Sequence, residues 1–200
     1  MIVSAIRPAI VLIIFFTLLT GLALPLAFNG LGAAVMPYQA NGSLLMKGDT
    51  VVGSALIGQV FTSDKYFHGR PSATTDTDPA DSTKQVPAPY NAASSLASNY
   101  APTSQALIDR VKADIEAAGP TSNPGPVPAD AVTTSASGLD PHISPAFAAR
   151  QVASVAKARG LQEGDVQTLL ERQTEGRLFG LIGEPRVNVL RLNLALDAVQ

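Results

Sequence analysis

The sequence predicts an α+β protein: one membrane-spanning helix near the amino terminus, followed by one mixed α/β domain outside the cytoplasm. Three observations lead to this fold class. Residues 8–28 are almost wholly apolar, segments 144–160 and 164–174 carry apolar residues at helical spacing, and segment 186–197 alternates as a strand does. A chain of 200 residues is long enough for one such domain and hardly for two.

The apolar run over residues 8–28 fits a membrane helix better than a cleaved signal peptide. At a rise of about 1.5 Å per residue, the run reaches roughly 30 Å, the thickness of the hydrocarbon layer. The apolar region of a signal peptide covers only about 7–15 residues. Small residues at LGAA (31–34) offer a cleavage point, but the length of the run favours an anchor.

Flanking cations predict the orientation of this helix. Arg7 and the α-amino group precede the run closely, whereas the next cation, Lys47, lies well beyond it. Because the cytoplasmic side of a membrane protein carries the excess of cations, we expect residues 1–7 in the cytoplasm, residues 8–28 in the membrane and residues 29–200 outside.

Strands, turns and one helix are expected in the first half of the outer domain. Glycine-punctuated apolar residues predict short strands over 41–61. Segment 72–104 is rich in Ser, Thr, Ala, Asp and Pro and is predicted to be an irregular surface excursion, with Tyr90 available to pin it to the domain. Apolar spacing predicts a helix over 102–120, and the proline-rich segment 121–130 is predicted to be a turn region without a helix.

Two helices and a strand are expected in the second half. Ser144 is suited to cap the 144–160 helix, Pro145 to its first position, and Gly160 to its end. Its apolar stripe consists of Ala148, Val152, Val155 and Ala156. The 164–174 helix follows, and the alternating segment 186–197 predicts a strand with one buried face.

Composition excludes several classes of site. The net charge is −2 and neither sign forms a block, which argues against a nucleic-acid partner. Cysteine is absent, so disulfides, thiolate nucleophiles and cysteine-bound zinc are excluded. With only two histidines, His68 and His142, we expect no bound metal. The chain also lacks the Walker, GxGxxG, GxSxG and HExxH motifs.

The densest candidate segment is SGLDPHISP, residues 137–145, which places Asp140 and His142 two residues apart. The pair could belong to a hydrolytic triad with a serine, form a turn through side-chain bonds to nearby backbone groups, or contact a partner. An i, i+2 pair around a proline usually points apart, so we favour the turn-forming role.

Other polar residues are candidates for structural or partner contacts. Arg70, in YFHGRPS, is suited to an acidic partner or to an internal carboxylate, and we favour the internal ion pair. His68 precedes a glycine and is expected to be an exposed turn residue. Glu184, Arg186 and Asn188, in GEPRVN, predict a polar contact patch or a turn entering a strand. Gln151 on the 144–160 helix completes the set.

Several blocks of the chain together resemble the KdpC subunits of the bacterial high-affinity potassium-transporting ATPase. These blocks are SALIGQVF, YFHGRPSA, PVPADAVTTSASGLDPHISPAFAARQVASVAKARGL and LIGEPRVNVLRLNLALD. The resemblance covers nearly the whole chain, including the membrane helix. One departure is local: the family usually reads SNLGPTN where this chain has SNYAPTS (98–104).

The resemblance implies a non-catalytic accessory subunit in the inner membrane, in contact with lipid. Its partners would be a potassium-channel-like subunit, a P-type ATPase subunit and a small single-helix subunit. Such subunits are described as catalytic chaperones that raise the ATP affinity of the pump subunit, so ATP is implied through the complex and no directly bound cofactor is expected. A domain outside the membrane alters ATP affinity only by linkage. Two alternatives stay open: a direct nucleotide-binding module, and a membrane-anchored hydrolase that uses His142.

Overall fold

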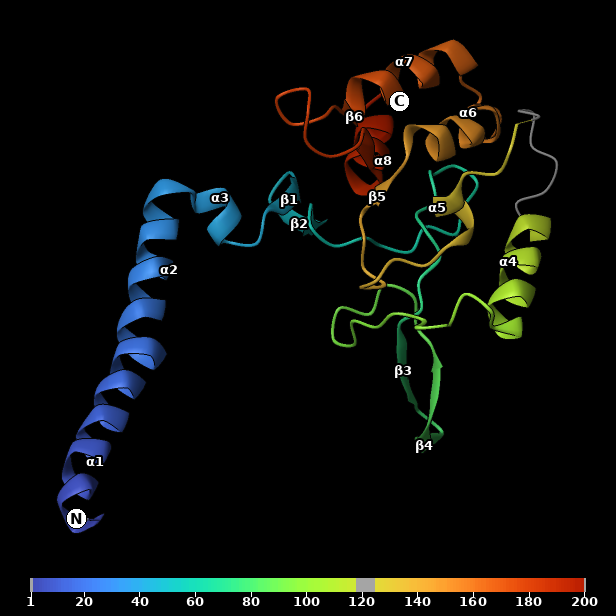
Figure 1. Cartoon of the computed structure of the whole chain (residues 1–200). Helices are drawn as coiled ribbons and strands as arrows, with labels where there is room; N and C mark the ends of the chain where they lie inside the picture. The colour runs from blue at the N-terminus through green and yellow to red at the C-terminus, as the bar shows by residue number, and fades with distance from the viewer. Residues whose placement is uncertain (1, 118–124, 200) are drawn as a thin grey trace. The chain divides into compact units, whose positions relative to one another are not determined.

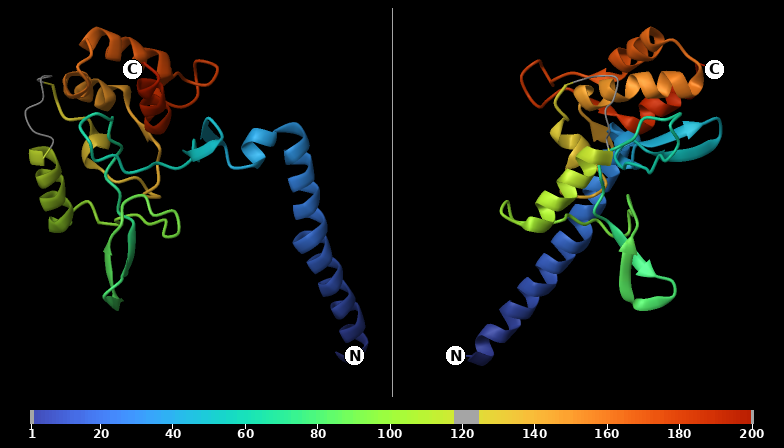
Figure 2. Two further views of the ribbon diagram at one scale, coloured as in Figure 1. Left: turned by 180° about the vertical axis from the view of Figure 1, so that it is seen from behind. Right: turned by 90° about the vertical axis from the view of Figure 1, so that its right-hand side faces the viewer.

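The computed structural model describes residues 2–117 and 125–199. The chain forms two compact units, Met1–Ser54 and Ala55–Gln200, each shown in Figures 1 and 2 and each described here by itself. The first unit contains a long apolar helix and the second unit is mixed α and β, which confirms the predicted fold class.

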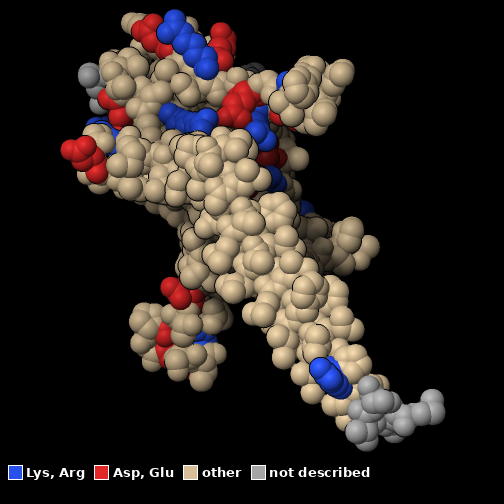
Figure 3. All heavy atoms as spheres, turned by 90° about the vertical axis from the view of Figure 1, so that its left-hand side faces the viewer, with Lys and Arg blue, Asp and Glu red and all other residues tan. Residues whose placement is uncertain are grey.

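The amino-terminal unit is dominated by a continuous helix built from α1 (Ile2–Leu18), a π-helical turn η1 (Leu19–Ala23) and α2 (Leu24–Val35). Within it, the apolar stretch Ala5–Val35 of 31 residues contains an 18-residue window with a mean hydropathy of 2.6, and no side chain of that window is buried. Figure 3 shows most of this helix as a column without charged residues. By length and composition it fits one membrane span. The helix extends past residues 8–28 at both ends, and the boundaries of the span stay a prediction.

The π turn lies directly before Pro25. Leu24 donates its backbone N–H to the carbonyl of Leu19, five residues earlier. Proline has no N–H and its ring crowds the carbonyl four residues before it, so one widened turn lets the helix continue. The Thr20 hydroxyl donates to the carbonyl of Phe16 at 2.7 Å, which keeps its polar group satisfied inside an apolar segment.

A short helix and a hairpin complete this unit. Helix α3 (Pro37–Ala40) is followed by the antiparallel strands β1 (Leu44–Lys47) and β2 (Thr50–Ser54), joined at Gly48, whose φ is 60°. These strands confirm the expectation for the first part of 41–61. The remainder is wrong, because residues 55–61 form turns and irregular backbone.

The core of the carboxy-terminal unit is formed by three helices that lie together in Figure 1: α6 (Pro145–Arg159), α7 (Glu163–Gln173) and α8 (Val189–Asp197). The predicted stripe of the first helix is buried as expected: Ala148, Val152, Val155 and Ala156. Ser144 accepts the N–H of Phe147 at 3.0 Å, and Gly160 ends the helix at a φ of 69°. The local signals at both ends of α6 are therefore confirmed.

The predicted strand over 186–197 is wrong beyond its first residues. Strand β7 (Arg186–Asn188) lies between β5 (His142–Ile143) and β6 (Thr174–Glu175) in a small antiparallel sheet, and the chain then turns into α8. Asn188 starts the helix by accepting the N–H of Arg191 at 3.1 Å. The buried positions of α8 are Val189, Leu190, Leu192, Asn193 and Leu196. Spacings of three and four fit a helix, and the alternation of leucines only imitated a strand.

The predicted excursion 72–104 contains more regular structure than expected. Strands β3 (Thr75–Asp78) and β4 (Asp81–Pro87) form an antiparallel hairpin. Its strands carry Thr, Asp and Gln rather than apolar residues, so periodicity gave no signal. Asp78 closes the turn by accepting the N–H of Ala80 at 2.8 Å.

Two further helices follow this hairpin in the chain, before the core helices. Helix α4 (Gln105–Ala117) confirms most of the prediction for 102–120, whose last three residues lie outside the described residues. The short helix α5 (Ala129–Val132) begins inside the segment predicted to contain none. The described part of that prediction is therefore wrong at its carboxyl end.

Candidate functional site

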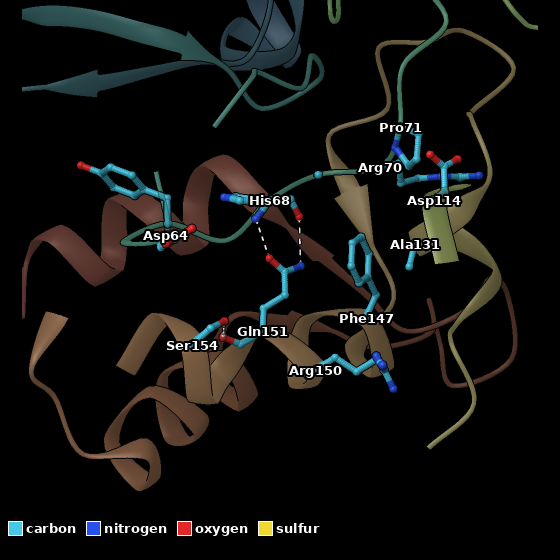
Figure 4. A pocket seen from close by; sticks show the side chains of 12 residues that line it. Asp64, His68, Arg70, Pro71, Asp114, Ala131, Phe147, Arg150, Gln151 and Ser154 are labelled. Carbon is cyan, nitrogen blue, oxygen red and sulfur yellow. Dashed lines mark hydrogen bonds between the residues drawn. The ribbon is translucent and has the colours of Figure 1, made fainter. Parts of the chain in front are cut away.

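Two side-chain amides, one from α6 and one from α8, bind the backbone of Phe67 and His68. Gln151 of α6 donates Nε2–H to the carbonyl of His68 at 3.1 Å and accepts the N–H of His68 at 2.7 Å (Figure 4). Asn193 of α8 makes the same pair of bonds with Phe67, both at 2.9 Å. We call the four residues Phe67, His68, Gln151 and Asn193 the amide clamp.

The amide clamp places an irregular segment inside the domain. Phe67 is completely buried and Asn193 is 2% exposed. Backbone groups at such positions need partners, because an unpaired buried donor or acceptor costs about 1–3 kcal/mol. The two amides supply the bonds that a neighbouring strand would otherwise give. His68 is half-buried with its backbone held, so its prediction as an exposed turn residue is wrong.

Arg70 lies two residues beyond the amide clamp and binds the segment before α6. Its guanidinium donates to the Asp140 carboxylate at 3.2 Å, to the Thr133 carbonyl and hydroxyl at 3.4 and 3.3 Å, and to the Thr134 carbonyl at 3.3 Å. The structure thus pairs Arg70 with an internal carboxylate. The planar fork of arginine suits this several-way contact.

Asp140 and His142 form a turn. One Asp140 oxygen accepts the backbone N–H of His142 at 3.0 Å, and the same oxygen lies 3.5 Å from the ring nitrogen Nδ1. Partial burial alone would raise the pKa of Asp140. Bonds from the ring and backbone of His142, together with the charge of Arg70, outweigh burial and lower the pKa of Asp140 below its ordinary value.

A second carboxylate, Asp130, binds the end of the 137–145 segment and was missed in the sequence analysis. Asp130 of α5 accepts the backbone N–H of Ser144 at 2.6 Å and its hydroxyl at 2.9 Å. The hydroxyl of Ser144 therefore donates to Asp130 while it caps α6 through Phe147. Among the described residues, no hydrogen bond joins His142 to a serine, so the geometry required of a hydrolytic triad is not formed.

Tyr90 locks the same region from the side of the β3–β4 hairpin. Its hydroxyl donates to the carbonyl of Arg70 at 2.7 Å. The side chain lies so close to two glycines that a Cβ at Gly58 would clash with the ring and a Cβ at Gly69 with the hydroxyl. Burial, followed by the negative charge of Asp140, raises the pKa of Tyr90 to about 12. Tyr90 therefore pins segment 72–104 to the domain, as expected.

The structure gathers most of the predicted candidates around one hollow. A cavity of about 530 Å³ is lined by Arg70, Asp140, His142, Glu184 and Arg186, among others. A second cavity of about 420 Å³ shares Arg70 and contains Gln151 (Figure 4). Glu184 and Arg186 do not pair with each other: Glu184 binds Arg177 at 2.7 Å and Arg186 binds Glu175 at 3.0 Å.

The chemistry available at these hollows is that of charge and hydrogen bonding. Over residues 2–117 and 125–199, no group of three or more His, Asp or Glu side chains is placed to hold a metal ion. Asn193 and Asp130 were missed because their partners lie far away in sequence. A polar residue on an otherwise apolar helix face was the only available signal for Asn193.

Comparison with known proteins gives a consistent result over the whole chain. The model of the KdpC family, described as the c chain of the K+-transporting ATPase, matches residues 6–198. The potassium-transporting ATPase KdpC subunit of Rhodopseudomonas palustris strain BisB18 is 61% identical over 195 residues, which cover 98% of both chains. The subunit of the same name from Methylobacterium nodulans is 60% identical, over 96% of this chain and 95% of its own length.

Proposed function

The chain belongs to the KdpC family, and from this premise we propose that it is a non-catalytic accessory subunit that stabilises the potassium-transporting ATPase and modulates it. The match to the family from residue 6 to residue 198 carries the proposal, because it includes both the apolar helix and the carboxy-terminal unit. In this role the helix anchors the chain in the bacterial inner membrane, and one face of the carboxy-terminal unit binds the other subunits.

The geometry of the candidate residues supports a structural role for them. The polar atoms of Gln151, Arg70 and Asp140 are hydrogen-bonded to backbone and side-chain groups of the same unit. A catalytic group needs a free position beside the reacting atom. A set of residues bound up internally gives instead a rigid body with a fixed surface, which suits a subunit that acts by binding.

The side of the membrane decides how such a subunit can act on ATP hydrolysis. Arg7, directly before the apolar run 8–28, and the distance from that run to Lys47 favour a carboxy-terminal unit outside the cytoplasm. From there, the subunit would raise ATP affinity by binding more tightly to the conformation of the pump that binds ATP. The amount by which it shifts that equilibrium equals its difference in affinity for the two conformations.

The experiment that tests this role compares purified complexes with and without the chain. We expect loss of the chain to lower the yield of intact complex and to raise the ATP concentration at half-maximal potassium-dependent hydrolysis. An unchanged yield together with an unchanged ATP dependence would contradict the proposal. A reporter enzyme that is active only outside the cytoplasm should be active when fused to the carboxyl terminus, and one that is active only inside should be inactive there.

Direct nucleotide binding is the second candidate, and the amide clamp argues against Gln151 as its recognition residue. Both atoms of the Gln151 amide are within 3.1 Å of backbone groups of His68. A nucleotide would have to replace these bonds and leave His68 unpaired. Labelling of this chain by a photoreactive ATP analogue, competed by ATP, would favour direct binding.

Hydrolysis through His142 is the third candidate. Since the ring of His142 faces Asp140 and is joined to no serine among the described residues, we expect His142→Ala to leave ATP hydrolysis by the assembled complex unchanged. Loss of a hydrolytic activity in that variant, with assembly intact, would support the enzyme instead.

A further inference from the structure

The segment from Arg177 to Glu184, between β6 and β7, projects from the carboxy-terminal helices in both views of Figure 2. We call it the 177–184 hairpin. Four of its residues are large and apolar, and their exposed fractions are high: Leu178 60%, Phe179 85%, Leu181 83% and Ile182 64%. Contiguous exposed apolar side chains of this size mark a binding surface.

The backbone of the hairpin is closed upon itself. Leu178 and Ile182 exchange two hydrogen bonds, of 2.9 and 3.0 Å. Gly180 donates to the carbonyl of Arg177, and Leu181 donates to that of Leu178. These N–H groups keep their partners when water leaves, so burial of the tip against an apolar surface would not strand them.

The tip is held in a shape that points its aromatic side chain outward. Phe179 has a φ of 53° and is followed by Gly180 at 73°. A positive φ is unfavourable for phenylalanine, and the surrounding hydrogen bonds maintain it. A preformed tip loses little conformational entropy when it binds.

Ion pairs surround the base of the hairpin. Arg177 donates to both oxygens of Glu184, at 2.9 and 2.7 Å, and Glu175 accepts from Arg186 at 3.0 Å and from Arg191 at 3.3 Å. An apolar tip within a polar rim is the usual anatomy of a protein–protein contact. The Arg177–Glu184 pair at the base, which we also call the neck, balances its own charge and adds no net charge there.

We propose that the 177–184 hairpin inserts Phe179 and Leu181 into an apolar pocket on another protein subunit of the ATPase. The fixed shape, the polar rim and the lack of Trp and Tyr in the hairpin favour a shaped protein pocket over a lipid surface, where Trp or Tyr is usual at the interface. The inference rests on the proposed function, since it needs a complex in which this chain is a subunit.

Substitution of the tip tests the contact directly. Phe179→Asp with Leu181→Asp should lower the amount of this chain that co-purifies with a tagged second subunit by about tenfold or more, as loss of a buried anchor does. Val199→Asp is the matched control, because Val199 is also apolar and 53% exposed but lies outside the hairpin. The control should co-purify like the parent chain.

The outcomes separate the two proposals. Failure of the parent chain to co-purify would sink the proposed function. Parent and double variant recovered in equal amounts would overturn only the role of the hairpin. Thermal unfolding of the full chain in detergent should be unchanged in the double variant, which excludes misfolding as the reason for its loss.

A single cysteine identifies what the tip touches. The chain has no cysteine, so the purified Phe179→Cys chain can carry one photoreactive maleimide, attached before the complex is assembled. We expect an adduct with a different subunit. An adduct only with a second copy of this chain, or quenching of a fluorophore at this position only by spin-labelled lipid, would contradict the proposal.

Discussion

The amide clamp and the 177–184 hairpin both contain a phenylalanine in irregular backbone, yet Phe67 is completely buried and Phe179 is 85% exposed. In the clamp, side chains from two helices satisfy the backbone of Phe67 and His68. In the hairpin, the backbone satisfies itself. A segment whose hydrogen-bond partners come from remote elements is fixed inside the fold, whereas a self-sufficient segment is free to face a partner.

The two phenylalanines should therefore differ most in their contribution to folding. We expect Phe67→Ala to lower the free energy of unfolding by about 3–5 kcal/mol, since it removes a fully buried ring. Phe179→Ala should change it by less than about 0.5 kcal/mol, as at other exposed positions. Urea unfolding of the full chain in detergent, followed by far-ultraviolet circular dichroism, measures both. Equal losses would mean that the hairpin is part of the core.

The two amides of the clamp should differ according to their burial. Asn193→Leu removes two hydrogen bonds and leaves the N–H and carbonyl of Phe67 buried without partners, so we expect a loss of about 3 kcal/mol. Gln151→Leu is the matched change at half-buried His68, where water can replace the amide, and should cost about 1–2 kcal/mol. The same unfolding measurement applies, and the reverse order would refute the explanation of the clamp.

The Arg70–Asp140 ion pair beside the amide clamp should contribute more to the free energy of unfolding than the Arg177–Glu184 pair at the base of the hairpin. Arg70→Met leaves the partly buried Asp140 without its cation and should cost about 2 kcal/mol. Arg177→Met breaks a pair whose side chains are 46% and 79% exposed, and should cost less than about 1 kcal/mol. A larger loss at Arg177 would show that the neck stabilises the fold itself.

The pH dependence of the same variants gives an independent check. Because the pKa of Asp140 is lowered in the folded state from its ordinary 3.8, its contribution to stability is present above that value and is lost as pH falls through the folded pKa. In Arg70→Met this acid loss should shrink. Unfolding free energies measured from neutral pH down to well below 3.8 would show an unchanged slope if Arg70 does not act on Asp140.

Tyr90 should give a small effect that depends on pH only in the alkaline range. Its pKa is raised from 10.0 to about 12 in the folded state, so its contribution is complete below pH 10 and is lost as pH rises toward 12. Tyr90→Phe removes this titration and the hydrogen bond to Arg70, and should cost about 1 kcal/mol at neutral pH. The difference between parent and variant should shrink above pH 10. A constant difference would mean that Tyr90 ionises equally in both states.

Features that depend on near neighbours in the chain could be predicted from sequence. The ends of α6 follow from Ser144, Pro145 and Gly160, whose effects act within one turn of the helix. The apolar helix follows from the length and the apolar composition of its segment. The error over 186–197 has a local cause as well, because leucines alternate there, and only contact with the core separates the buried face of a helix from that of a strand.

The candidate site was predictable in its members but not in its arrangement. Arg70, Asp140 and His142 were singled out by residue type, and the fold brings them to one hollow with Glu184 and Arg186. Which side chains pair with each other could not be predicted, because the partners come from distant segments: Arg70 and Asp140 lie 70 residues apart in the chain. Asp130 was missed because its hydrogen-bond partner, Ser144, lies 14 residues further along the chain and was already assigned as the cap of the 144–160 helix.

By itself the sequence determined the apolar helix, the caps of α6 and the absence of cysteine chemistry, since each depends on composition or on neighbours along the chain. Only the tertiary structure decided that Asn193 and Gln151 hold the backbone of Phe67 and His68, and that Phe179 faces outward. The physical reason is that burial and hydrogen-bond pairing depend on which distant segments pack together. Residue type alone cannot separate Phe67 from Phe179, because both are phenylalanines, yet one is buried and the other exposed.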